Sequence, residues 1–166
     1  MPLKARSLST HFVRRVRTNK LDGNDYRLFR SEVREDFRAT CGYCLLEEKW
    51  AAGRENFELD HFRPQSLFPQ LAMSFHNLYW SCHVCNNVKR GRWPSMALLE
   101  LGIGFVDLCA SNFSDHFVEQ FSGKWRGKNL SARYTIDALR LNRPHLVELR
   151  RILHSYALID TGSTKA

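Results

Sequence analysis

Four of the five cysteines occur as two Cys-x-x-Cys pairs, the spacing typical of a structural zinc site. The first pair is Cys41 with Cys44 and the second is Cys82 with Cys85, and 37 residues lie between the pairs. Each pair can turn tightly around one side of a Zn²⁺ ion, so the four thiolates can form a tetrahedron. Four thiolates leave no open position for a substrate. The spacing therefore predicts a structural Zn²⁺ that clamps the two ends of the intervening segment together.

Residues that could hydrolyse a phosphodiester lie between the two cysteine pairs and directly after the second pair. Asp60 and His61 are adjacent, and Asn86 directly follows the second cysteine pair. Histidine titrates near neutral pH and is the usual general base, whereas carboxylate and carboxamide oxygens suit Mg²⁺ or Mn²⁺. If the zinc site brings Asn86 beside Asp60, one cation gains two oxygen ligands with a histidine nearby. Asn87 is an alternative to Asn86 as the amide ligand.

Two short elements are expected to position these residues. Alternating apolar and polar residues predict a strand over Phe57–His61, and a short helix is expected to start near Cys82 or Val84 and to carry Asn86. Successive side chains on a strand point to opposite faces. The strand must therefore bend or end at Asp60 and His61 if both side chains are to serve one site.

The rest of the chain predicts a single α+β domain. We divide it into a basic arm and helix over 1–40, a zinc and catalytic core over 41–94, and a strand–helix extension over 95–166. The apolar period predicts a helix from Asn24 or Asp25 to about Arg38. Beyond the core, we expect strands over Phe105–Leu108 and Phe117–Phe121, and helices over Thr135–Leu141 and from Pro144 to about Ile159. The apolar face of the last helix is expected to comprise Leu146, Leu149, Ile152, Leu153 and Tyr156.

Composition narrows the class of protein. The chain has 166 residues, of which 43% are hydrophobic, which is typical of a globular protein and argues against disorder. We see no apolar run long enough to span a membrane and no export signal, so we expect a cytoplasmic protein without a membrane partner. The net charge of +8 favours a polyanionic partner, because Lys and Arg release counterions from phosphates. Most of the excess charge lies in residues 1–40.

The stretch from Cys41 to Lys89 resembles the HNH, or ββα-metal, endonuclease family in its cysteine-bearing branch. The likeness covers roughly 50 residues and rests on a combined pattern: Cys41-x-x-Cys44, Asp60-His61-x-x-Pro64, Asn77, and Cys82-x-x-Cys85-Asn86-x-x-Lys89. Two histidines that give the family its name are replaced here by Asp60 and Asn86. Both replacements keep a ligand for a cation, so they do not imply an inactive protein.

The resemblance implies a ββα-metal core with flanking helices and a role for each matched residue. His61 would be the general base, Asp60 and Asn86 would bind the catalytic cation, and Asn77 would steady the loop that holds the histidine. The cation would be Mg²⁺ or Mn²⁺, with Zn²⁺ or Ni²⁺ as alternatives. The substrate would be DNA, with a single-metal mechanism and a 5′-phosphate product. Phosphate contacts are expected from four basic residues: Arg63, Lys89, Arg90 and Arg92.

A second likeness concerns the stretch from Ile136 to Pro144, which is similar to the tail of HNH proteins of bacterial phage-defence systems. It implies a partner such as an ATPase or another subunit of a defence complex. One active site per chain is compatible with a homodimer that cuts both strands. The alternatives are a nuclease that acts on RNA, a non-catalytic zinc module that binds nucleic acid, and a subunit of a defence complex that depends on its partner.

Overall fold

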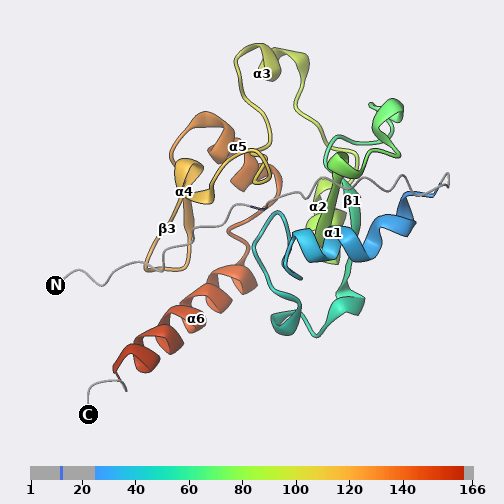
Figure 1. The fold of residues 1–166 in the computed structure, drawn as a ribbon. Helices are drawn as coiled ribbons and strands as arrows, with labels where there is room; N and C mark the ends of the chain where they lie inside the picture. The colour runs from blue at the N-terminus through green and yellow to red at the C-terminus, as the bar shows by residue number, and fades with distance from the viewer. Residues whose placement is uncertain (1–11, 13–24, 163–166) are drawn as a thin grey trace.

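The computed structural model describes residue 12 and residues 25–162, with side chains described as far as residue 156. The basic arm expected before the first helix lies almost entirely outside this range. The fold is α+β, as expected: in the described part of the chain, helices surround two separate antiparallel sheets of two strands each. Figure 1 shows one sheet packed among α1 and α2, and the second beside α4, α5 and α6.

The first sheet and α2 form a ββα unit that contains the expected site residues. Strand β1 (Phe57–His61) pairs with β2 (Leu78–Cys82), and α2 (His83–Lys89) follows β2 without a break. The register places Asp60 opposite Tyr79. The expected strand over Phe57–His61 and the expected helix after Cys82 are both confirmed.

The expected helix before Cys41 is also present, in two pieces. A 3₁₀ turn, η1 (Tyr26–Phe29), leads into α1 (Arg30–Asp36), and the side chain of Asp25 caps the turn by accepting a hydrogen bond from the backbone N–H of Arg27. Val33 and Phe37 point into the core, where they have no exposed surface. Phe37 contacts Tyr79 of β2, with 4.9 Å between the ring centroids. The apolar period thus identified the buried face of this helix.

Several short elements connect these parts. Four are 3₁₀ turns and two are short helices: η2 (Glu48–Trp50), η3 (Arg54–Asn56), η4 (Pro69–Leu71), η5 (Phe75–Asn77), α3 (Met96–Glu100) and α4 (Phe113–His116). The expected strand over Phe105–Leu108 is wrong. No strand forms here: Val106 N–H donates to a side chain, Thr135 Oγ1 (2.9 Å), and Leu108 lies in a turn.

The C-terminal extension combines a small hairpin with two helices. Strands β3 (Phe117–Glu119) and β4 (Trp125–Gly127) form the hairpin, which is followed by α5 (Leu130–Ala138) and α6 (Pro144–Gly162). α5 starts earlier than expected because the side chain of Asn129 caps it by accepting from Ala132 N–H. None of the helices in the described part of the chain combines the length and apolar character that crossing a bilayer requires.

The predicted apolar face of α6 is only partly correct. Leu146 is buried, but Ile152 and Tyr156 are 44% and 64% exposed. The helix instead rests on the hairpin through polar groups. Arg150 lies over the Trp125 ring at 3.9 Å, and His154 Nε2 is 2.6 Å from Glu119 Oε1. Hydrophobic periodicity could not reveal a helix that docks through an arginine and a histidine.

Candidate active site and metal centre

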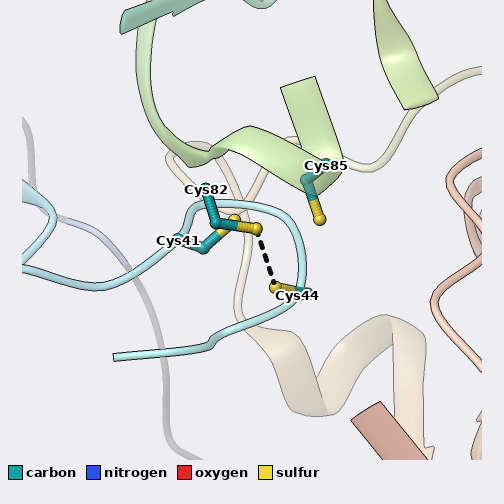
Figure 2. Close-up of side chains that lie close together, drawn as sticks. All are labelled: Cys41, Cys44, Cys82 and Cys85. Carbon is teal, nitrogen blue, oxygen red and sulfur yellow. Dashed lines mark hydrogen bonds between the residues drawn. The ribbon is translucent and has the colours of Figure 1, made fainter. Parts of the chain in front are cut away.

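The four paired cysteines converge on one point, as their spacing predicted. All four are buried, and their sulfur atoms lie within 4.8 Å of one another. Tetrahedral Zn–S bonds of about 2.3 Å place neighbouring sulfurs about 3.8 Å apart. The distance from Cys44 Sγ to Cys82 Sγ is 3.8 Å. Figure 2 shows the side chains pointing toward a common centre, so the cluster has the ligands and the dimensions of a structural Zn²⁺ site.

The loop that contains the first cysteine pair, residues 40–47, is called the knuckle, and its backbone explains how Cys41 and Cys44 reach this centre. Residues 40–47 form a tight hairpin closed by a bridge between Thr40 and Glu47. Cys41 N–H donates to Leu46 O (2.8 Å), and Leu45 N–H donates back to Cys41 O (3.0 Å). These bonds fold the loop so that both thiols lie on the same side.

Gly42 lets the knuckle lie against β2. Its N–H donates to the carbonyl of Trp80 in that strand (2.8 Å). A Cβ atom at this position would lie only 2.5 Å from Phe37 Cε1 and 2.6 Å from Tyr79 Cδ1. Because both atoms belong to fully packed aromatic rings, only glycine allows this approach. The glycine therefore joins the first cysteine pair to the strand that leads into the second.

Asp60 lies in a buried polar pocket beside the cysteine cluster. Its carboxylate Oδ2 accepts a hydrogen bond from the Tyr43 hydroxyl (2.5 Å) and lies 3.1 Å from Lys89 Nζ. Lys89 has no exposed surface, and its ammonium also donates to the carbonyl of His61 (2.6 Å). Among the described residues, the Tyr43 and Lys89 contacts to Asp60 both involve Oδ2 and leave Oδ1 without a hydrogen bond.

The charges in this pocket depend on one another. Burial raises the pKa of Asp60, but Lys89 and Tyr43 oppose that rise. Burial lowers the pKa of Lys89, and Asp60 opposes that fall. Burial next to Asp60 raises the pKa of Tyr43 well above its usual value, so its hydroxyl stays protonated and can donate. A buried ion pair with additional hydrogen bonds is the arrangement in which each charge tolerates desolvation.

His61 follows Asp60 but has different neighbours. Its Nε2 lies 2.9 Å from the carbonyl oxygen of Ala72, and its ring meets Tyr26 edge-on at 4.6 Å. A carbonyl can only accept, so Nε2 carries the proton of the neutral ring, and Nδ1 retains the lone pair that a general base needs. Asp60 and His61 both lie inside the paired strand β1, and their side chains have separate partners.

Asn77 holds the loop that follows His61. Its Oδ1 accepts from Arg63 N–H (2.9 Å), and its Nδ2 donates to Arg63 O (3.0 Å) and Leu71 O (3.3 Å). Asn77 is itself buried, at 6% exposure. The Asn77 side chain thus binds both the N–H and the carbonyl of Arg63, two positions after His61. It also binds the carbonyl of Leu71, which is next to Ala72, the hydrogen-bond partner of His61.

The other expected site residues differ in how far they are exposed to solvent. Asn86 is half-buried on α2, one turn before Lys89, and Arg63, Arg90 and Arg92 are exposed. The expectation that Lys89 contacts phosphate is wrong for this structure, because the side chain is fully buried against Asp60. Sequence reasoning also missed Tyr43. Its place inside the first Cys-x-x-Cys pair was the available signal, since the knuckle must pack against the ββα unit.

Comparison with known proteins agrees with this geometry. Residues 41–92 match the family described as HNH endonuclease, so the resemblance of this segment to that family is confirmed. A curated relative, Septu protein PtuB of Bacillus thuringiensis, is 29% identical over 123 residues. That alignment covers 73% of this chain and 42% of the relative, so it spans about two fifths of the relative's length.

Proposed function

We propose that this protein is a metal-dependent endonuclease that hydrolyses DNA phosphodiester bonds. The observation that carries the proposal is the state of His61, whose Nε2 is bound to a backbone carbonyl while Nδ1 remains available as a base. This histidine lies next to a carboxylate inside a segment that matches HNH endonucleases. His61 Nδ1 would take the proton from the water that attacks the scissile phosphorus.

Asp60 and Asn86 would hold the catalytic cation, Mg²⁺ or Mn²⁺. Mg²⁺ sites in nucleic-acid enzymes commonly use one or two carboxylates together with substrate phosphates. Tyr43 and Lys89 fix Oδ2 of Asp60, which leaves Oδ1 to face a cation. When bound, the cation would stabilise the negative charge of the transition state and of the leaving oxygen. The cysteine-bound Zn²⁺ would serve the fold alone.

Substrate positioning would come from the exposed arginines around the site. Arg63 extends from the loop that Asn77 clamps, and its guanidinium lies 5.8 Å from the centroid of the Phe68 ring. Arg90 follows the last residue of α2, so both side chains leave the ββα unit at its edge. Positive groups at these positions would hold the phosphates on either side of the scissile bond.

The experiment that tests the proposal measures nicking of supercoiled plasmid with Mg²⁺ or Mn²⁺ for the wild type and His61→Ala. Loss of a general base is expected to lower the rate by about 10²- to 10⁴-fold. His83→Ala is the matched control, because His83 is an exposed histidine of the same ββα unit. It should cut at the wild-type rate. Equal cutting by His61→Ala and the wild type would remove His61 from the mechanism.

Single-stranded DNA and RNA belong in the same experiment. Cleavage of RNA alone would change the substrate class while keeping the roles of His61 and Asp60. Binding without any cleavage would favour a non-catalytic module, or a subunit that becomes active only with its partner.

The relative named Septu protein PtuB supports a place in bacterial phage defence. We propose that the chain acts there with a further subunit, such as an ATPase, and that two copies combine to cut both strands. Size measurement by light scattering, with and without a candidate partner, tests this assembly separately from cleavage.

A further inference from the structure

Arg143 lies against the cysteine cluster although it belongs to the C-terminal extension. Its Nη2 donates to Cys85 Sγ across 3.3 Å, and the two residues are 58 positions apart in the sequence. Its Nη1 lies 3.4 Å from the carbonyl oxygens of Leu139 and Arg140 at the end of α5. The guanidinium is therefore attached to the extension on one side and to a zinc ligand on the other.

A second arginine of the extension, Arg150, lines the same cavity as Cys44. Arg150 on α6 is buried, and its Nη1 donates to Leu141 O (2.9 Å). Its Nη2 has no hydrogen-bond partner among the described residues. Burial lowers the pKa of Arg150 to about 10, and the Cys44 and Glu119 charges oppose that fall. One short stretch of chain thus supplies one cationic side chain in contact with Cys85 and a second that shares a cavity with Cys44.

The charge of a zinc centre with four thiolates explains why cations gather there. Four thiolates and one Zn²⁺ carry a formal net charge of about −2, which is costly to bury without compensation. A hydrogen bond and a positive charge at a thiolate also make the sulfur less nucleophilic and less easily protonated.

We propose that Arg143, assisted by Arg150, is the counter-charge of the zinc centre, and that it clamps the C-terminal extension onto the metal-bound core. The extension lies outside residues 41–92, the segment that matches the HNH family. The arginines therefore set how firmly Zn²⁺ is held and protect the thiolates from electrophiles and oxidants. Neither effect depends on whether the protein cleaves DNA.

The test compares Arg143→Gln, Arg143→Lys and Arg151→Gln in zinc-loaded protein. Arg151 is the matched control, because it is an exposed arginine on α6 that pairs with Glu148. Loss of a partner that orients a metal ligand typically costs about 10- to 100-fold in metal affinity. We expect that loss for Arg143→Gln in competition with a chromogenic chelator, a smaller loss for Arg143→Lys, and wild-type affinity for Arg151→Gln. Alkylation of the cysteines by N-ethylmaleimide should be fastest in Arg143→Gln, slower in Arg143→Lys, and at the wild-type rate in Arg151→Gln.

The proposal would be overturned if a folded Arg143→Gln protein bound Zn²⁺ with wild-type affinity and was alkylated at the wild-type rate. It would also be overturned if Arg151→Gln lost as much zinc affinity as Arg143→Gln. Hydrogen exchange on the wild type keeps the test decisive if Arg143→Gln does not fold. Removal of Zn²⁺ should then speed exchange in residues 139–150. Unchanged exchange there, while residues 41–44 and 82–85 open, would show that the extension is not attached to the metal centre.

Discussion

The cysteine cluster and the Asp60 pocket share two segments of the chain, although Asp60 comes from β1 and Cys82 from β2. The knuckle supplies Cys41 and Cys44 to one centre and Tyr43 to the other, and α2 supplies Cys85 to the first and Lys89 to the second. The first centre offers four identical ligands for one ion. The second combines a phenol, a carboxylate and an ammonium. Because the two centres share these segments, we expect disruption of the metal centre to disturb the carboxylate pocket as well.

The largest expected effect comes from breaking the metal centre. Cys82→Ser should lose stoichiometric Zn²⁺ and cooperative thermal unfolding, because structural zinc sites supply about 10–16 kcal/mol in small zinc domains. Elemental analysis and circular dichroism measure the two losses. Cys109→Ser is the control, because Cys109 is the cysteine outside the cluster, and it should keep its zinc. A Cys82→Ser protein that stays folded and active would show that the carboxylate pocket does not need the metal centre.

An intermediate effect should follow from breaking the buried ion pair. Lys89→Met leaves the Asp60 carboxylate buried without its cation, and removing one partner of such a pair typically costs about 3–5 kcal/mol. Urea unfolding measures the change in the free energy of unfolding, and zinc content should stay at one ion per chain. Lys89→Met combined with Asp60→Asn should cost less than the two single changes added together. Strict additivity would mean that the two residues do not interact.

The smallest effect concerns the loop beyond β1. Asn77→Ala removes three hydrogen bonds to the backbone of Arg63 and Leu71, and unsatisfied buried groups cost about 1–3 kcal/mol. The metal centre should remain intact while cleavage falls, because the histidine's loop is no longer fixed. The exposed Asn87 is the matched control, and Asn87→Ala should change the free energy of unfolding by less than about 0.5 kcal/mol. A stable, fully active Asn77→Ala would remove the loop from the site.

The sequence was most informative where local spacing carried the signal. The Cys-x-x-Cys pairs, the strand over Phe57–His61 and the helix after Cys82 were all predictable, since turn geometry and side-chain alternation are local properties. The prediction for Phe105–Leu108 was wrong because a buried segment without regular structure can have the same composition as a strand. The backbone partners separate the two, and here Val106 N–H binds the side chain of Thr135, 29 positions further along.

The sequence by itself determined the chemistry present in this protein: four thiolates spaced for one metal ion, and an adjacent carboxylate and imidazole that can serve a phosphodiester. The tertiary structure alone decided how those groups are supported. It placed Lys89 in the carboxylate pocket rather than on the surface, Tyr43 on Asp60, and Arg143 on Cys85. Such pairings join side chains that are 17 to 58 positions apart in the sequence, and no local pattern indicates which distant residues will meet.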